Sequence, residues 1–67
     1  MNRSLMNCVY ECRAKKQMTQ QDLADAVDVT RQTVIAIEKG NYIPSVALAL
    51  ALATLFKKPV EQLFYYE

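Results

Sequence analysis

The spacing of apolar residues along the chain is typical of short amphipathic helices, in which buried positions recur every three or four residues. Val9 and Cys12 share one side of the first such segment, and Leu23, Ala24 and Val27 share one side of the second. The pattern predicts an all-α protein with five helices, over residues 9–16, 20–27, 31–39, 46–56 and 60–64.

Residues suited to helix ends mark the boundaries of these segments. Thr19 begins a Thr-x-x-Asp sequence, and Thr30 and Ser45 each stand directly before a helical run. Hydroxyl side chains at such positions accept hydrogen bonds from the first turn of a helix. Gly40 is placed to end the third helix, and Pro59 suits the start of the fifth. Three residues separate the second and third helices, which predicts a sharp corner between them.

The fourth predicted helix carries more apolar residues than one buried face requires. We expect its buried face to consist of Val46, Ala49, Leu50, Ala53 and Phe56. A second stripe lies on another side, and exposed apolar patches usually mark interfaces. With the apolar tail of the chain, this stripe predicts a homodimer surface made of Leu48, Leu52, Leu55, Leu63, Phe64, Tyr65 and Tyr66. The alternative is that the fifth helix folds over the stripe within one chain.

Length and composition are those of one small folded domain, which we expect to span residues 1–67. The chain is 52% hydrophobic and contains one glycine, which excludes a disordered, low-complexity protein. The net charge of +1 does not by itself indicate a partner. The positions of the charges must therefore decide whether nucleic acid is bound.

The chain also lacks the sequence features of secreted, membrane and metal proteins. Its longest run rich in apolar residues, Val46–Phe56, has 11 residues, against the roughly 20 that span a bilayer. The N-terminus does not resemble a signal peptide, so we expect a cytoplasmic protein without a membrane partner. Cys8 and Cys12 are expected to be free thiols packed near the core, with a redox switch as the alternative. With no His and no further Cys, a zinc site lacks ligands, and we expect no cofactor, metal or small-molecule ligand.

The corner between the second and third helices has the form of a helix-turn-helix. Ala24 is small where the two helices approach each other, and Val34 with Ile37 holds the third helix in place. The outward side of the third helix then consists of Thr30, Arg31, Gln32, Thr33, Ala36 and Lys39. Arg pairs with guanine, Gln with adenine, and Thr or Ala contacts the thymine methyl group, so these side chains are suited to reading bases in the major groove.

Four blocks in this region resemble the Cro/CI-like (XRE) family of bacterial and phage repressors, especially its short, single-domain members, which act as dimeric transcriptional regulators. The blocks are TQQDLA at 19–24, VTRQTV at 29–34, IEKG at 37–40 and PS at 44–45, and the resemblance covers residues 9–64. It implies a five-helix domain in which the chain ends pair as a small antiparallel sheet, residues 3–6 against 64–67.

The resemblance also implies roles for individual residues. Gln20 would contact a phosphate, Arg31, Gln32 and Thr33 would face bases, and Ala36 would lie near a base methyl group. Lys39, Asn41 and Tyr42 would hold the DNA backbone, and Arg13 would form an ion pair with Glu38. One departure is Asp28, which replaces the glycine of the family at the corner. A left-handed backbone at Asp28 is therefore expected.

These observations predict a sequence-specific DNA-binding regulator, most simply a repressor, that binds a twofold-symmetric operator as a homodimer. The alternative with the same fold is an antitoxin-like module that binds another protein through its apolar surface. An enzyme is disfavoured, because no His could activate Cys8 or Cys12 and no phosphate-binding glycine loop is present.

Overall fold

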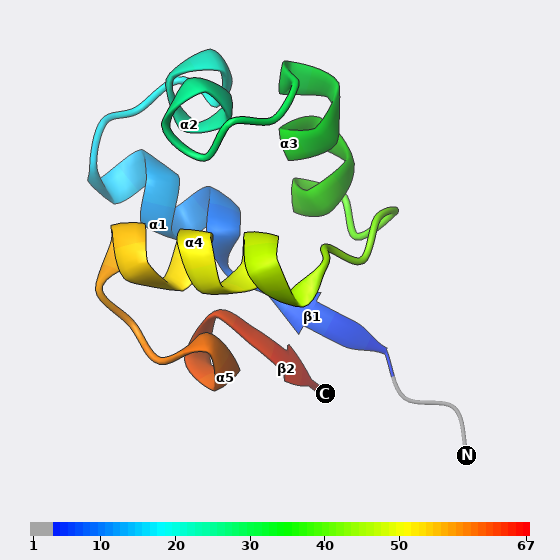
Figure 1. Cartoon of the computed structure of the whole chain (residues 1–67). Helices are drawn as coiled ribbons and strands as arrows, with labels where there is room; N and C mark the ends of the chain where they lie inside the picture. The colour runs from blue at the N-terminus through cyan, green and yellow to red at the C-terminus, as the bar shows by residue number, and fades with distance from the viewer. Residues whose placement is uncertain (1–3) are drawn as a thin grey trace.

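The computed structural model describes residues 4–67 as one small bundle of short helices closed by a two-stranded sheet (Figure 1). Helices α2 and α3 lie at one end of the molecule, α5 and the sheet lie at the other, and α1 and α4 lie between them (Figure 1). The elements in order are β1 (Leu5–Asn7), α1 (Val9–Lys15), α2 (Gln20–Ala26), α3 (Arg31–Glu38), α4 (Val46–Phe56), α5 (Val60–Leu63) and β2 (Phe64–Tyr66). The predicted all-α class with a small terminal sheet is confirmed.

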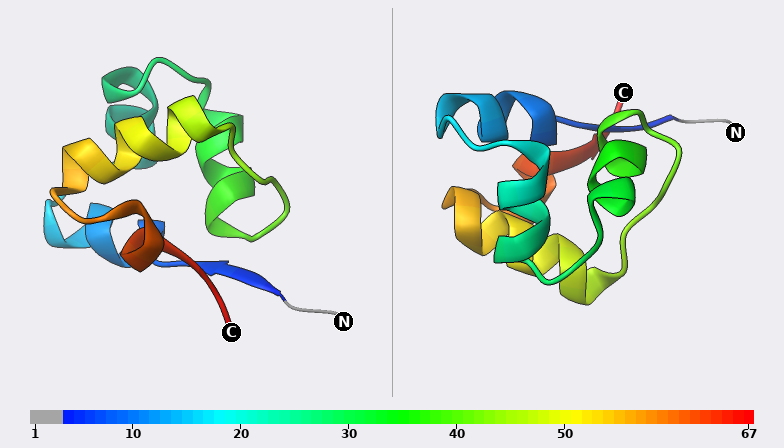
Figure 2. Two further views of the ribbon diagram at one scale, coloured as in Figure 1. Left: turned by 60° about the horizontal axis from the view of Figure 1, so that its bottom comes forward. Right: turned by 90° about the horizontal axis from the view of Figure 1, so that it is seen from above.

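The sheet joins the two ends of the described chain. Strands β1 and β2 are antiparallel, and Met6 pairs with Tyr65 at their centre. Figure 2 shows the two strands side by side at the edge of the molecule. The first strand begins later than the sequence suggested, at Leu5, and Arg3 of the expected strand lies outside the described residues.

Side-chain caps begin three of the helices, as the sequence predicted. Thr19 and Asp22 form a reciprocal capping box, in which each side chain accepts a hydrogen bond of 2.9 Å from the other residue's backbone N–H. Thr30 accepts from the Thr33 amide at 3.2 Å, and Ser45 starts α4 in the same way. Each such cap contributes about 1 kcal/mol, which matters for helices of only two or three turns.

The core draws on every helix of the described chain. Its buried members are Val9, Cys12, Leu23, Ala24, Val34, Ile37, Leu52, Ala53 and Leu63. Helices α2 and α3 pack against each other, and α5 packs against α4. No helix within residues 4–67 is long and apolar enough to cross a membrane.

The predicted buried face of α4 is wrong for Val46 and Leu50, although Ala53 is buried in the core and Phe56 packs against it. Val46 and Leu50 are 77% and 52% exposed, whereas Leu52 is 1% exposed and belongs to the core. Leu63 is also fully buried, and Leu48 and Leu55 are half-buried against the core. Leu52 and Leu63 therefore cannot contact a second chain, because α5 folds against α4 within one chain.

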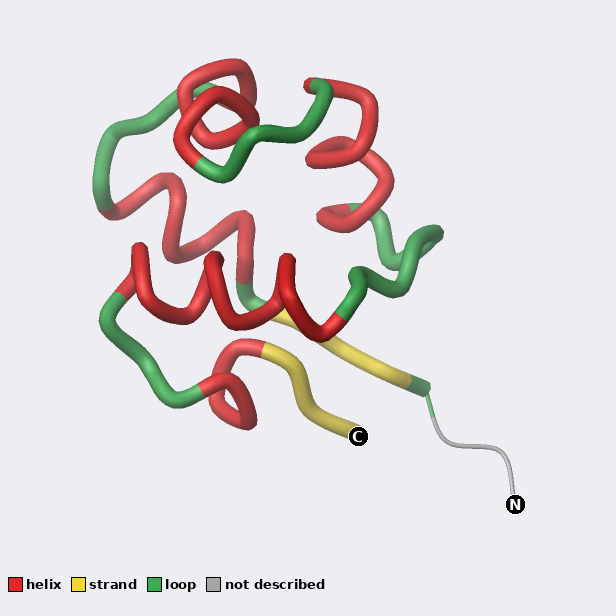
Figure 3. Tube along the Cα trace, in the orientation of Figure 1, coloured by secondary structure: helices red, strands yellow, loops and turns green. Residues whose placement is uncertain are grey.

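The corner before α3 has the left-handed backbone that the sequence predicted. Asp28 has φ +59°, and the chain turns sharply between the two helices (Figure 3). Gln17 and Lys57 adopt the same region, each with φ +56°, and neither was predicted. Side chains with a Cβ are strained in this region by roughly 1 kcal/mol, less for Asp than for most.

Replacing Asp28 with glycine is expected to raise the melting temperature by a few degrees. Glycine removes the Cβ strain, and this gain of at most about 1 kcal/mol exceeds the loss from a more flexible unfolded chain. Thermal unfolding followed by circular dichroism measures the shift. The matched control is Ala26→Gly in the exposed part of α2, which should lower the melting temperature by a similar amount. An unchanged or lower value for Asp28→Gly would refute strain at the corner.

Candidate nucleic-acid interface

Helix α3 is held rigidly by its inner side and by the corner that precedes it. Val34 and Ile37 are buried in the core. The Val29 amide donates to the Ala24 carbonyl at 2.9 Å, and the half-buried Val29 side chain packs beneath the corner. The opposite side of α3 is therefore presented to the surroundings in one orientation.

The residues on the outward side of α3 differ in how exposed their side chains are and in whether those side chains already have partners. Arg31, Gln32 and Lys39 are exposed, and their side chains form no hydrogen bond or ion pair with any residue between 4 and 67. Thr33 is half-buried, and its hydroxyl lies 3.0 Å from that of Thr30. Because the Thr30 hydroxyl already caps the helix, the beginning of α3 offers chiefly Arg31 and Gln32 to a ligand. Ala36, one turn further on, is half-buried.

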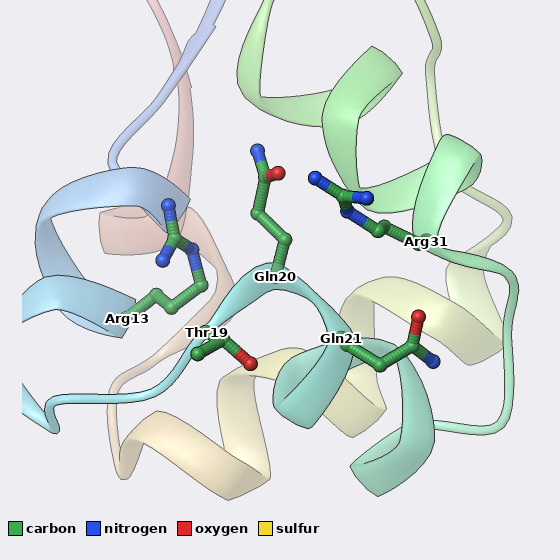
Figure 4. Close-up of a pocket in the computed structure, with 5 residues that line it drawn as sticks. All are labelled: Arg13, Thr19, Gln20, Gln21 and Arg31. Carbon is green, nitrogen blue, oxygen red and sulfur yellow. The ribbon is translucent and has the colours of Figure 1, made fainter.

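A polar hollow lies beside the start of α3, between helices α1, α2 and α3. It has a volume of about 680 Å³ and is lined by Arg13, Thr19, Gln20, Gln21 and Arg31. Figure 4 shows the Gln20 amide between the guanidinium groups of Arg13 and Arg31, while Gln21 points away from them. Two lining residues are cations. Arg13 is paired with Glu38, whereas Arg31 forms no ion pair within residues 4–67, so Arg31 is the cation of the hollow that is available to an anionic group such as a phosphate.

An ion pair ties α1 to the end of α3 beneath this hollow. The Arg13 Nε and Nη2 atoms donate to the two carboxylate oxygens of Glu38 at 2.6 and 3.2 Å. The two side chains are only 12% and 7% exposed. Arg13 also donates to the Met18 carbonyl at 2.8 Å and stacks on Tyr10, with its guanidinium carbon 5.2 Å from the ring centre. The hydrogen bond to Glu38 raises the pKa of Arg13, so the guanidinium stays charged.

Gln20 shares the same carboxylate. Its side-chain Nε2 donates to Glu38 Oε1 at 3.2 Å. One of the two amide hydrogens is thus engaged inside the protein, and the other is available to the hollow. The side chain therefore links the start of α2 to α3 as well as facing the predicted ligand.

The residues after α3 lie at the opposite end of that helix from Arg31. The backbone N–H of Asn41 donates to the Ala36 carbonyl at 2.9 Å and ends the helix, and the Asn41 side chain is exposed. Tyr42 is also exposed and borders a second hollow of about 220 Å³, which it shares with Leu5, Ile43 and Phe64 among others. Loop residues 41–44 therefore lie beside strand β1 and the start of β2.

Sequence reasoning missed Asn7, which joins the sheet to α3. The Asn7 side chain donates to the Ile37 carbonyl at 3.0 Å and accepts from the Val9 amide at 3.1 Å. It thus fixes the end of α3 relative to β1 and α1 at once. No motif contains this position, and an asparagine near the chain start has no distinguishing sequence signal.

The residues of the predicted homodimer surface divide into a buried group and an accessible group. Tyr65 and Tyr66 are exposed, and Phe64 is half-buried beside the second hollow. Val46 and Leu50, which were predicted to be buried, are exposed one helical turn apart on α4, and Ile43 in the preceding loop is exposed as well. We call these three residues the exposed apolar row. Large apolar side chains left in water on one side of a helix are typical of contact surfaces.

The chain is similar to known proteins over nearly its whole length. A family model described as helix-turn-helix matches residues 9–63. The uncharacterized HTH-type transcriptional regulator YgzD of Bacillus subtilis is 46% identical over 63 residues, which cover 94% of this chain and 96% of that protein. An uncharacterized HTH-type transcriptional regulator of Methanocaldococcus jannaschii is 51% identical over 55 residues, covering 82% and 83% of the two chains. One from Archaeoglobus fulgidus is 44% identical over 59 residues, covering 88% and 84%.

Proposed function

Because this chain belongs to the XRE-type helix-turn-helix family of DNA-binding transcriptional regulators, we propose that it is a repressor that binds a twofold-symmetric operator as a homodimer. The observation that carries this proposal is the exposed start of α3. There Arg31 and Gln32 have no side-chain partner within residues 4–67, and Arg31 lines a polar hollow between α1, α2 and α3. Occupying the operator would exclude RNA polymerase without any chemistry on the DNA.

In this proposal the residues of the interface have two kinds of role. Arg31 and Gln32 read base edges in the major groove, and the half-buried Thr33 and Ala36 offer methyl groups to thymine. Contacts to the backbone fix the position of α3 but do not read sequence. We assign that second role to Gln20, Lys39, Asn41, Tyr42 and the backbone amides after Thr30.

The proposed dimer would place two recognition helices about 34 Å apart, one helical turn of DNA. We propose that the chains meet through the exposed apolar row Ile43, Val46 and Leu50. Ile43 also lines the second hollow together with Phe64, which precedes the exposed tail tyrosines in the chain. We further propose that residues 1–67 form a single DNA-binding domain.

Selection of bound duplexes from a random library tests the DNA-binding proposal. The unmodified chain should enrich a palindrome, and Arg31→Ala and Gln32→Ala should each relax specificity at one or two bases per half-site. The expected loss is about 1–3 kcal/mol for each lost base contact. Lys15→Ala is the control, because it removes one exposed positive charge on α1 and should leave the selected sequence unchanged. Equal affinity for all duplexes, or none, would instead favour a protein-interaction module.

Sedimentation equilibrium tests the dimer surface separately. Leu50→Lys should raise the dimer dissociation constant at least tenfold, because a charge would be buried in an apolar contact. Ala14→Lys, on the exposed side of α1, should leave the constant unchanged. A chain that is monomeric at all concentrations, or a dimer that tolerates Leu50→Lys, would exclude this surface.

A further inference from the structure

The two cysteines form a close pair of thiols to which the DNA-binding proposal assigns no role. Their Sγ atoms lie 3.6 Å apart, and both cysteines are free. Cys12 lies within α1, but Cys8 is the residue before the helix, with φ −117° and ψ +30°. This backbone is neither helical nor extended, and it brings the Cys8 side chain beside that of Cys12. The pair is therefore shaped by the junction of β1 with α1.

The separation of the sulfur atoms limits what they can bind together. With bonds of about 2.3 Å to a shared atom, a 3.6 Å separation corresponds to an angle of about 100° between the two sulfurs. A linear two-coordinate ion would need sulfurs roughly 4.6 Å apart, twice that bond length. A tetrahedral ion needs two further ligands, and within residues 4–67 no group of three or more His, Cys, Asp or Glu side chains could supply them.

The protonation of the thiols also disfavours a metal cation. Burial, followed by the hydrogen bond and charge of Cys8, raises the pKa of the Cys12 thiol, so Cys12 carries its proton at neutral pH. A metal cation must displace thiol protons into solvent, which a raised pKa opposes. An oxide of trivalent arsenic instead carries an oxygen atom that takes both protons away as water.

We propose that Cys8 and Cys12 form a two-thiol chelating site for trivalent organoarsenicals. Trivalent arsenic is pyramidal, with bond angles far from linear, and a mono-substituted arsenical is complete with two sulfur ligands. The reaction is a condensation in which an arsenoxide and two thiols give one dithioarsenite and one water. Two As–S bonds form, the arsenic–oxygen bond breaks, the thiol protons leave with the oxygen, and no atom changes oxidation state.

The surroundings of the pair leave room for the organic group of the ligand. Cys12 borders a surface hollow of about 130 Å³, together with Lys15, Lys16, Phe56 and Lys58. The Phe56 side chain offers an apolar wall to an aryl substituent. Chelation removes the hydrogen of the Cys8 thiol, which donates to the Gln62 carbonyl with 3.5 Å between Sγ and the oxygen. The backbone hydrogen bond from Cys8 to the Leu63 carbonyl, at 3.1 Å, does not depend on that thiol.

The test treats the reduced, folded chain with one equivalent of phenylarsine oxide. Intact-mass measurement should give one phenylarsenic group per chain with loss of one water, and thiol titration should show both cysteines consumed. The adduct should survive excess glutathione, a monothiol, and be released by a small dithiol. The melting temperature should rise on binding, because a ligand that prefers the folded state stabilises it.

Cys8→Ser is the deciding variant, because Cys8 is only partly buried and one thiol remains in the core. Loss of the chelate should weaken retention of the arsenical in glutathione on the order of a hundredfold. Cys12→Ser should behave in the same way, provided that circular dichroism shows it folded. Retention by Cys8→Ser equal to that of the unmodified chain, two arsenicals per chain, or a fall in melting temperature would each overturn the proposal.

Discussion

Replacing Glu38 with alanine is expected to lower the free energy of unfolding by about 2–3 kcal/mol, less than the effect of removing one partner of a fully buried ion pair, because both residues are only partly buried. Arg13 would keep its charge among side chains that exclude most water, since it is only 12% exposed in the pair. Gln20 would lose its acceptor at the same time. The carboxylate thus stabilises three helices through one group.

Urea unfolding of four variants separates the parts of this network. Arg13→Ala should be nearly as damaging as Glu38→Ala, because each leaves a partly buried charge without its partner. Gln20→Ala should lower the unfolding free energy by only about 1 kcal/mol, one hydrogen bond. The double variant Arg13→Met with Glu38→Leu should be more stable than either single alanine variant, since it leaves no charge behind. Losses below 1 kcal/mol for both single variants would mean that the pair is effectively solvated.

The helix boundaries could be predicted from sequence because local chemistry determines them. Thr19, Thr30 and Ser45 satisfy amide groups within three residues of themselves, so their effect does not depend on the rest of the fold. The left-handed corner at Asp28 was predicted for a different reason, the missing glycine of a known family pattern. Gln17 and Lys57 adopt the same backbone without such a pattern, and nothing local distinguishes them.

The orientation of α4 could not be predicted, because its sequence is apolar on every side. Residues 46–56 read VALALALATLF, with a single hydroxyl and no charge. Amphipathic periodicity assigns a buried face only where a polar face contrasts with it. The packing of α5 against α4 helps to determine which side of α4 is buried. That contact forms only when the fold brings the two helices together.

The candidate DNA interface was predictable to the extent that it lies in one continuous motif. Arg31 and Gln32 follow the cap of α3, so their outward position results from helix geometry alone. The contribution of Asn7 depends on the sheet that brings residue 7 beside residue 37, a contact across 30 positions of the chain. The hollow beside Arg31 likewise needs three helices to be in place.

Replacing Leu52 with alanine is expected to destabilise the protein by about 2–5 kcal/mol, whereas Leu50→Ala should change the free energy of unfolding by less than about 0.5 kcal/mol in the monomer. The two substitutions remove the same atoms from the same helix. They differ because Leu52 is 1% exposed and would leave a cavity, while Leu50 is 52% exposed and would leave none.

Chemical unfolding measured over a dilution series makes this comparison quantitative. Any contribution of Leu50 through the proposed dimer would grow with protein concentration, since association stabilises only the folded chain. The Leu52→Ala loss should persist at the lowest concentration, because it arises inside one chain. If instead Leu50→Ala proved the more damaging at every dilution, α4 would bury the opposite face, and the exposed row Ile43, Val46 and Leu50 would no longer be available to a second copy.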